Sequence, residues 1–373
     1  MHNISADSLV NLLSFDYKGV DIRLKSLSIG EMYDDNVRFE KENKIDDLIT
    51  IAGIEAVAKY EGKRRMFEIG ADVSSQTFAH HDVYDNITQE VTTRFRNEFS
   101  KYDSVSLTNH FSHSDAPLFN RKKDFFLEQF GRTGGRFDYY QNRFDIEYLR
   151  EVTRRLAVSF RYDNDIDVFT GVDMENSFYH SAGARANYML TSDTGLLLSG
   201  NYAGRWFEDG GNASIYTITT GIRQTITNKI YFDGKIGVNV VDSFDNEDFS
   251  KLLADAALFY RTDSDLLGRL SFTKKTDTNP YVEDVFNNWR ISASLAHQFL
   301  KRLGSSVSVF YGRGEFDASG SEQRFTGLNT TVLYDISKRL TGTFTYTYSD
   351  ADSNINTADY TKNTAFFGIK AEF

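Results

Sequence analysis

The stretch LLLSGNYAGRW, residues 196–206, decides the fold because its side chains fall into two alternating sets. Leu196, Leu198 and Tyr202 belong to one set, while Ser199 and Asn201 belong to the other. Successive side chains of a β-strand point to opposite faces of the sheet, so this alternation predicts a strand with one apolar and one polar face.

The same period of two recurs along nearly the whole chain. The segments that show it are 20–33, 47–60, 66–78, 87–99, 104–112, 136–149, 155–165, 177–190, 195–207, 213–226, 229–241, 250–261, 265–274, 286–299, 304–313, 323–335, 340–349 and 360–373. Short polar turns and longer connections join them in alternation, and both prolines, Pro117 and Pro280, lie in longer connections. Short turns on one rim and long loops on the other predict an all-β protein, a single transmembrane antiparallel up-and-down β-barrel of about 18 strands.

The composition agrees with this architecture and excludes several others. The 373 residues include no cysteine, which rules out disulfides, thiolate metal sites and a cysteine nucleophile. Aromatic residues make up 14% of the chain, which is too rich for a disordered protein. No run of about 18 apolar residues is present, so no transmembrane helix is expected. The formal net charge of -11 argues against nucleic acid as a partner.

Aromatic residues mark both ends of the apolar band. Segments that run toward the short turns end, with Ile226 as the exception, on an aromatic girdle: Tyr60, Phe99, Tyr148, Tyr188, Tyr260, Phe299, Tyr334 and Phe373. Near the opposite ends lie Phe78, Phe111, Tyr162, Trp206, Phe272, Tyr311 and Tyr348. Two such rows are typical of a surface that crosses a bilayer, because amphipathic rings settle at headgroup depth. A β-propeller has a similar repeat length, but its blades contain four short strands, whereas each repeat here contains two long ones.

The C-terminal stretch FFGIKAEF, residues 366–373, resembles the last strand of bacterial outer-membrane barrels. Such strands end in Phe, here Phe373, preceded by apolar residues at every second position, here Ala371, Ile369 and Phe367. The resemblance implies that the barrel-insertion machinery recognises this strand. It also implies a place in the bacterial outer membrane, surrounded by its lipid and lipopolysaccharide.

A second resemblance runs over nearly the whole chain from residue 20. The stretches SLSIGEMYDDN (26–36) and KIDDLI (44–49) are similar to the opening hairpin of the putative β-barrel porin type 2 family. Many members are encoded with exopolysaccharide synthesis and export genes, so the resemblance implies an exopolysaccharide channel that works with a periplasmic polysaccharide-export protein. Residues 1–18 have no place in the family pattern. We expect a periplasmic or plug segment there, followed by the barrel over 19–373.

The polar strand positions should face the lumen, and many of them are basic: Arg94, Arg96, Arg143, Arg161, Arg185, Arg205, Arg223, Arg269, Arg290 and Lys235. A barrel of this width is too wide for side chains to fill. Because guanidinium groups bind carboxylate and sulfate, one interpretation is a path that favours anions. The other is a mesh of salt bridges that stiffens the wall, since acidic residues share the face: Glu90, Glu98, Asp145, Glu147, Asp163 and Asp233.

The third long connection, 113–135, combines an apolar triplet, FFL at 125–127, with basic residues and glycines. The basic residues are Arg121, Lys122, Lys123, Arg132 and Arg136. In general porins the third loop folds into the lumen and narrows it, and this loop is similar by position. We therefore expect the triplet to anchor against the wall and the basic residues to line a constriction. The alternative is an exposed lid.

No motif indicates catalysis. The seven histidines form no metal-binding motif, and we expect no catalytic residue, no metal and no cofactor. The leading hypothesis is passive secretion of an exopolysaccharide, anionic in view of the basic lumen. A general or anion-selective diffusion porin for small solutes is the first alternative. A barrel enzyme or surface-binding scaffold with a closed lumen is the second.

Overall fold

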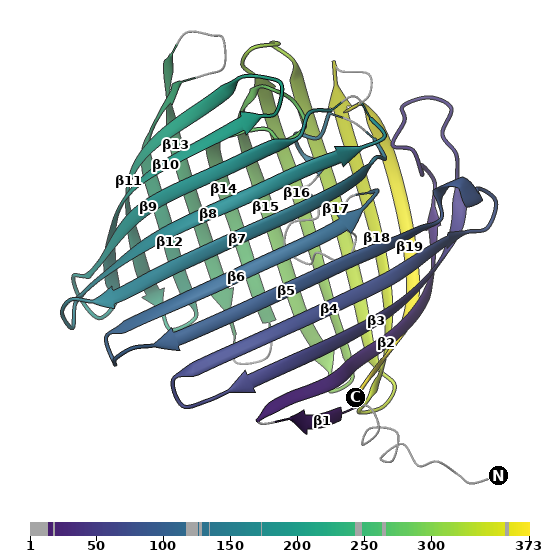
Figure 1. Cartoon of the computed structure of the whole chain (residues 1–373), viewed down its shortest axis with the longest axis horizontal. Coiled ribbons are helices and arrows are strands. Elements are labelled where there is room, and N and C mark those ends of the chain that lie inside the picture. The colour runs from purple at the N-terminus through teal and green to yellow at the C-terminus, as the bar shows by residue number, and fades with distance from the viewer. Residues whose placement is uncertain are drawn as a thin grey trace.

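The chain closes into a single antiparallel barrel. The computed structural model describes residues 14–17, 19–116, 126, 129–133, 135–172, 174–242, 248–262, 266–354 and 358–373. Each strand from β2 onward pairs with the next, and β19 returns to pair with β2 (Figure 1). Strands β2 to β19 therefore form a barrel of eighteen strands, which confirms the predicted fold class.

The strands have nearly the predicted bounds. They are β1 (Ser14–Tyr17), β2 (Val20–Asp34), β3 (Asp47–Glu61), β4 (Arg65–Phe78), β5 (Asn86–Glu98), β6 (Asp103–Ser114), β7 (Asp138–Glu151), β8 (Leu156–Thr170), β9 (Ser177–Met189), β10 (Thr194–Phe207), β11 (Asn212–Thr227), β12 (Ile230–Asp242), β13 (Phe249–Arg261), β14 (Leu266–Thr278), β15 (Val285–Leu300), β16 (Leu303–Phe316), β17 (Glu322–Asp335), β18 (Leu340–Ser353) and β19 (Tyr360–Glu372). One 3₁₀ helix, η1 (Asp82–Tyr84), lies between β4 and β5. We call the rim with the short connections the turn end and the opposite rim the loop end. In the described residues, no helix has the length and apolar character needed to cross a membrane.

Hydroxyl side chains fix several of the short turns. Thr191 Oγ1 accepts hydrogen bonds from the amides of Asp193 and Thr194, at 3.1 and 3.0 Å. Thr153 binds the amides two and three residues further along in the same way. The hydroxyl oxygen thus accepts hydrogen bonds from backbone amides that have no partner strand in the turn. The turn end is therefore compact for reasons that are local in sequence.

Four strands extend further toward the loop end than the alternation indicates. Strands β8, β14, β16 and β18 were predicted to end at residues 165, 274, 313 and 349, but they continue to Thr170, Thr278, Phe316 and Ser353. In these extensions the inner face is packed rather than wet, and Phe169 and Phe316 are buried there. The alternation of polar inner and apolar outer residues is therefore lost in these extensions, although the hydrogen bonds between the strands continue.

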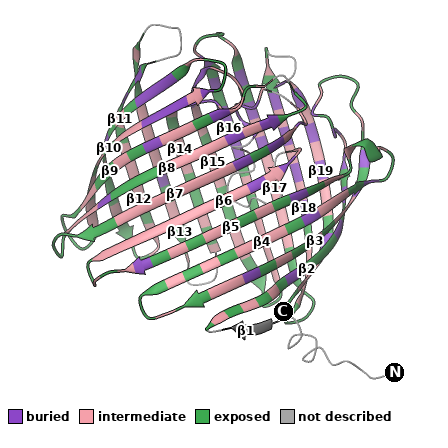
Figure 2. Ribbon diagram, viewed as in Figure 1, coloured by how far each residue is buried: buried purple, intermediate pink, exposed green. Residues whose placement is uncertain are grey.

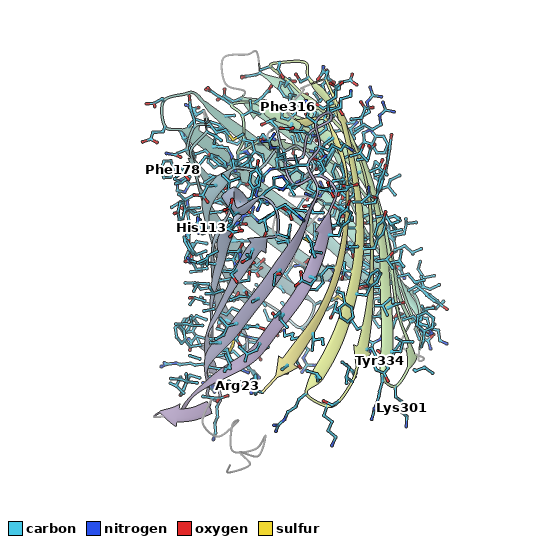
Figure 3. The ribbon with its side chains drawn as sticks, turned by 90° about the vertical axis from the view of Figure 1, so that its right-hand side faces the viewer. Arg23, His113, Phe178, Lys301, Phe316 and Tyr334 are labelled. Atoms are coloured by element: carbon cyan, nitrogen blue, oxygen red, sulfur yellow. The ribbon has the colours of Figure 1, made fainter. Side chains whose placement is uncertain are left out.

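The apolar strand positions form the outer surface of the barrel. Leu198, Ile218 and Leu252 are 58%, 68% and 71% exposed, which suits contact with lipid rather than with a protein core. In Figure 3 Tyr334 of the aromatic girdle lies near the turn end and Phe316 near the loop end. One residue of the second aromatic row was placed wrongly. Phe78 lies on the luminal face and is buried with Met32 and Ile49.

A short extra strand continues the seam where the barrel closes. Strand β19 pairs with β2 from Asp34 down to Ser26, and the Phe373 amide donates to the Lys25 carbonyl at 3.1 Å. Below that point β1 pairs with the same edge of β2, with Ser14 opposite Arg23 and Tyr17 opposite Val20. Gly19 permits the tight return between β1 and β2, because its φ of 82° is one that other residues rarely adopt. This strand is the described part of the segment predicted over residues 1–18.

Candidate solute pathway

Buried side chains gather at the loop end of the barrel, where two segments fold into the lumen (Figure 2). The first segment belongs to the third long connection, and we call its described residues 126, 129–133 and 135–137 the inward loop. The second consists of residues 276–286, where β14 and β15 meet, and we call it the inward hairpin. Sequence reasoning predicted the first segment and missed the second.

The inward loop is anchored by phenyl rings. Phe126 lies 5.9 Å from Phe310 and 6.0 Å from Phe325, measured between ring centroids. Phe130 lies 5.6 Å from Phe310 and 5.1 Å from Phe286. The apolar triplet therefore contributes at least Phe126 to an anchor on the wall. Phe125 and Leu127 lie outside the described residues.

Glycines on the luminal face of β16 and β17 make room for these rings. A Cβ atom added to Gly327 would lie 2.5 Å from the Phe126 ring, and one added to Gly312 would lie 2.9 Å from the Phe130 ring. At Gly314 the same atom would lie 2.1 Å from the Phe286 ring. Any other residue would displace an aromatic ring at these positions. On the luminal faces of β16 and β17, where polar residues are expected, phenylalanine and glycine occur instead. This pattern is the sequence signal that could have indicated the packing.

Polar contacts join the inward loop to the opposite wall. The Tyr360 hydroxyl donates to Gln129 Oε1 at 2.9 Å, and the Gly131 amide donates to Gln323 Oε1 at 2.6 Å. Asn279 of the inward hairpin donates from Nδ2 to the Gly131 carbonyl, also at 2.6 Å. The two inward segments therefore touch each other as well as the wall, and together they narrow the loop end of the lumen.

The inward hairpin is held by packing and by hydrogen bonds to the next loop. Val285 is fully buried against Ala213, Ile215 and Val241, which belong to the nearby strands β11 and β12. Asp284 accepts the amides of residues 318 and 319, at 2.8 and 3.0 Å. The neighbouring loop residue Asp317 has its pKa raised by burial, although Lys251 opposes this rise, and the charges of Asp284 and Glu315 raise the pKa further.

Arg132 and Arg136, which were predicted to line the constriction, make contacts within the protein instead. Arg132 donates to the Gly135 carbonyl at 2.9 and 3.1 Å and stacks on Phe137 at 3.9 Å. Arg136 donates to Asp115, with Nη2 at 3.0 Å from Oδ1, and covers the Phe78 ring. Both guanidinium groups are buried, so they stiffen the inward loop instead of facing an open passage. Arg121, Lys122 and Lys123 lie outside the described residues.

Arg205 connects three elements at the same end. Its Nη1 lies 2.8 Å from Asp167 and 2.6 Å from the Ser177 hydroxyl, while its Nε donates to the Thr278 hydroxyl at 3.2 Å. The side chains of Arg205 and Asp167 are only 6% and 3% exposed. This predicted luminal arginine therefore ties the inward hairpin to the wall.

The lower part of the lumen, toward the turn end, is wet by contrast. The side chains of Arg94, Arg161 and Arg223 are 52%, 54% and 71% exposed although they point inward from their strands. Each is paired: Arg94 with Glu68 at 2.7 Å, Arg161 with Asp145 and Asp163 at 2.6 Å, and Arg223 with Asp233 at 2.6 Å. Such exposed pairs contribute little to stability but keep the wall charged and hydrated.

The remaining predicted luminal residues have varied surroundings. Arg96 lies 3.0 Å from Glu98 and Lys235 lies 4.0 Å from Asp255. Arg269 covers the Phe259 ring at 5.2 Å, Arg290 is 3.4 Å from Asn288, and Arg143 is half-buried beside Asp165. Arg185 is exposed. Most of the predicted luminal basic residues therefore lie beside acidic, polar or aromatic neighbours, and several of them stay exposed.

The luminal charges are divided between two sectors of the wall. Strands β7 and β8 carry a mainly acidic set on the inner face: Asp145, Glu147, Asp163, Asp165 and Asp167. Strands β11 to β15 carry a mainly basic set on theirs: Arg223, Lys235, Lys251, Arg261, Arg269 and Arg290. Lys251 and Arg261 were not singled out from the sequence. A solute in the lumen therefore meets a basic sector on one side and an acidic sector on the other.

Three histidines at the loop end contact aspartates of the barrel wall. His80 and His81 place their Nδ1 atoms 3.2 and 2.8 Å from the buried carboxylate of Asp47. His113 lies 2.9 Å from Asp138, on a different strand pair. Within the ranges that the structure describes, no three His, Asp or Glu side chains are grouped as a metal site would need.

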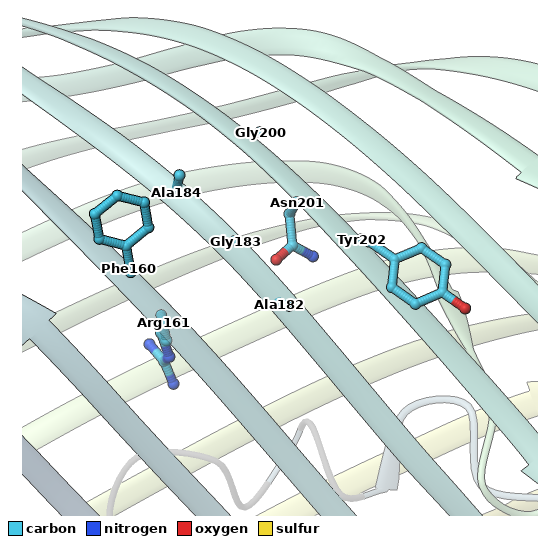
Figure 4. A pocket seen from close by; sticks show the side chains of 8 residues that line it. All are labelled: Phe160, Arg161, Ala182, Gly183, Ala184, Gly200, Asn201 and Tyr202. Carbon is cyan, nitrogen blue, oxygen red and sulfur yellow. The ribbon is translucent and has the colours of Figure 1, made fainter.

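A shallow depression lies in the barrel wall between Phe160 and Tyr202 (Figure 4). Small residues of β9 and β10 form its floor, among them Ala184 and Gly200. Polar groups are few there, and we assign it no role.

A closed barrel with a charged, wet lumen and an inward third loop is a porin-like barrel of the outer-membrane type. The family model described as "Putative beta-barrel porin 2" matches residues 265–373, which confirms the resemblance over β14 to β19. No curated protein sequence matches the chain.

Solved structures of outer-membrane proteins share the fold. OccK2 (OpdF) from Pseudomonas aeruginosa has a TM-score of 0.51 at 10% identity, covering 94% of this chain and 98% of that one. OpdK from the same organism has a TM-score of 0.50 at 9% identity, with the same coverage of 94% and 98%. The siderophore receptor PirA from Acinetobacter baumannii has a TM-score of 0.49 at 8% identity, covering 94% of this chain and 80% of that one. At identities this low, the matches to OccK2 and OpdK show similarity of fold alone.

Proposed function

We propose that this protein is a passive outer-membrane channel for small hydrophilic solutes, with a preference for anions along the β11–β15 sector. The observation that carries the proposal is the contrast in exposure along the lumen: Arg223 near the turn end is 71% exposed, whereas Arg205 at the loop end is 6% exposed. A wet vestibule that leads to a narrow end selects solutes by size and charge. The C-terminal strand, which ends in Phe373, resembles that of outer-membrane barrels. This resemblance implies that the turn end faces the periplasm.

The narrow end favours small solutes over polymers. The inward loop and the inward hairpin are joined to the wall by buried phenyl rings and by hydrogen bonds from Gly131, Asn279 and Tyr360. Segments fixed in this way act as a permanent constriction, since opening them would expose apolar rings and leave buried polar groups without partners. No covalent chemistry is needed for such a role.

Ion conductance of the purified full chain in planar bilayers tests the proposal. A steady conductance whose reversal potential leans toward anions is expected in a salt gradient. Replacing Lys235, Lys251 and Arg269 together by Gln should move the reversal potential toward cations, whereas Arg324→Gln should not, because Arg324 pairs with Asp352 at the outer rim. A cation-selective native channel would overturn the anion preference. Correctly folded but silent barrels would overturn the channel itself.

Export of an acidic polysaccharide is the second candidate, and one observation favours it. Tyr231 and Phe259 stack inside the lumen near the turn end, with ring centroids 4.3 Å apart, and offer a sugar chain an aromatic surface. Under this candidate a periplasmic export protein would have to hold the turn rim, and the channel should stay silent until that protein is added. Steady conductance of the isolated barrel would decide for the small-solute channel.

A further inference from the structure

The short turns at the turn end are unevenly charged around the rim. Five of them follow one another from β15 round to β8, with the seam between β19 and β2 in their midst. These five turns contain no acidic residue and nine basic ones, which we call the basic arc: Lys63, Arg64, Lys101, Arg154, Arg155, Lys301, Arg302, Lys338 and Arg339. The other three turns, between β9 and β14, contain one basic and three acidic residues. A chain of formal net charge -11 thus gathers cations on one side of one rim.

The strand ends beside the basic arc do not cancel its charge. The two strand residues on either side of each turn add five acidic and two basic residues: Glu61, Glu98, Asp103, Glu151, Asp335, Arg65 and Arg150. Glu61 is paired with Lys59 of the same strand at 2.6 Å. Glu98 is paired with Arg96 in the same way at 3.0 Å. The formal charge of this part of the rim therefore stays positive when the strand ends are counted.

Backbone hydrogen bonds hold the turns of the basic arc in place. Thr153 Oγ1 accepts the amide of Arg155 at 3.1 Å. The Arg155 carbonyl in turn accepts the amide of Met189 from the neighbouring strand at 2.7 Å, and the Arg302 carbonyl accepts that of Asp335 at 2.8 Å. All nine residues of the basic arc are exposed. Their cations therefore extend into solvent from a backbone that is fixed.

Exposed apolar side chains lie beside these cations in the same turns. Phe99, Val152 and Ile336 are 62%, 51% and 42% exposed. Figure 3 shows Tyr334 of the aromatic girdle and Lys301 of the basic arc together at the turn end. Amphipathic rings settle at headgroup depth, and long basic side chains beside them reach the charged surface of the membrane. The turns of the basic arc thus combine groups suited to acyl chains with groups suited to phosphates.

We propose that the basic arc binds anionic phospholipids of the leaflet at the turn end. The exposed apolar side chains contact the acyl chains, while the lysine and arginine groups bind the phosphate oxygens. Cations alone would suit an acidic protein equally well. The apolar residues beside them favour lipid, because both parts of a phospholipid then have a partner. Anionic lipid should gather on the side of the barrel from β15 round to β8, since the turns on the other side are acidic. This lipid site is separate from the proposed solute pathway.

Native mass spectrometry of the full chain in detergent counts the bound lipid without any need for ion flow. The probes are phosphatidylglycerol, which is anionic, and phosphatidylcholine, which is zwitterionic, at equal concentration. We expect the native chain to retain more phosphatidylglycerol than phosphatidylcholine. The arc variant replaces four of the nine cations together: Arg154→Gln, Arg155→Gln, Lys301→Gln and Arg302→Gln. It should retain roughly half as much phosphatidylglycerol as the native chain, because the attraction follows the number of cations near the lipid surface.

The matched control removes four exposed cations from the loop end instead: Lys41→Gln, Lys44→Gln, Arg313→Gln and Arg324→Gln. It should retain phosphatidylglycerol as the native chain does, and all variants should keep the heat-resistant electrophoretic mobility of a folded barrel. If the arc variant loses that mobility, Lys301→Gln with Arg302→Gln serves in its place and should show a smaller loss. Equal retention of the two lipids by the native chain would overturn the proposal, as would equal losses in the arc variant and the control. Full retention by the arc variant would also overturn it, in favour of an acidic protein as the partner of the basic arc.

Discussion

The Gly131 amide donates to Oε1 of Gln323 at 2.6 Å, although the two residues are 192 positions apart in the chain. Gln323 also donates from Nε2 to the Arg132 carbonyl at 3.3 Å, and its side chain is 1% exposed. One glutamine thereby binds the backbone of two successive residues of the inward loop. It fixes that loop to β17, on the opposite wall from the strands that the loop connects.

Replacing this glutamine should loosen the constriction. Gln323→Leu leaves a buried amide and a buried carbonyl without partners, which costs roughly 1–3 kcal/mol for each group. We expect larger and noisier single-channel currents in planar bilayers. Gln298→Leu is the control, because Gln298 is exposed at the turn end, where its Nε2 donates to the nearby Leu300 carbonyl. Identical currents from Gln323→Leu and the native chain would contradict the role of the anchor.

The glycine positions under the phenyl rings make a second prediction. Gly327→Val or Gly314→Val should push Phe126 or Phe286 off the wall and destabilise the packing by roughly 1–3 kcal/mol, the usual range for overpacked cores. The measurement is the urea concentration at which the barrel unfolds in detergent, together with its conductance. Gly70→Val provides the comparison, since no atom lies within 4 Å of a Cβ added at Gly70. If all three variants unfold at the same urea concentration, the aromatic rings do not require glycine at these positions.

The two arginine–aspartate pairs of β10 and β11 should differ sharply in their effect on stability. Arg205→Gln leaves Asp167 charged and buried, and breaking a buried pair costs roughly 3–5 kcal/mol. Arg223→Gln breaks an exposed pair and should cost less than about 1 kcal/mol. Unfolding in urea measures both. Adding Asp167→Asn to Arg205→Gln should restore part of the loss, and a double variant less stable than Arg205→Gln would contradict this account.

The loop residue Asp317 predicts a dependence on pH. Its pKa is raised in the folded protein, chiefly by burial, with a further contribution from the charges of Asp284 and Glu315. The stabilisation linked to this group is therefore complete below its unfolded pKa and is lost as the pH rises through its folded pKa. We expect Asp317→Asn to raise the unfolding temperature at pH 7 and to have no effect near pH 3. Asp335→Asn, at the turn end, is the control. A stabilisation by Asp317→Asn that is equal at both pH values would contradict the argument.

The strands could be predicted from the sequence because their signal is local. A period of two needs only neighbouring residues, and it located all the strands from β2 to β19 within a few positions. The lumen was harder, because pairs such as Arg223 and Asp233 depend on register between strands. Once the register is known, Arg223 and Asp233 are paired directly opposite each other. Alternation and turn length determine most of the register, so they also contain most of the information needed to predict such pairs.

The inward hairpin was missed because its cause lies far away in the sequence. Residues 276–286 fold inward to meet Phe130, Phe310 and Ala213, which belong to other parts of the chain. The sequence did carry a trace of this packing, since Phe310 and Phe325 occupy luminal positions that alternation assigns to polar side chains. The buried state of Arg132 and Arg136 had no comparable trace, because a basic residue in a loop is usually solvated.

The four residues of β1 have a consequence for the size of the passage. They occupy the edge of β2 from Val20 to Arg23, immediately below the point where β19 ends its pairing at Ser26. The closing strand cannot slide further along β2, because that edge is already hydrogen-bonded. In a closed barrel the stagger between the first and last strands sets the tilt and the diameter together. A strand outside the barrel count thus acts as a stop that holds the circumference, and with it the width of the lumen, at a single value.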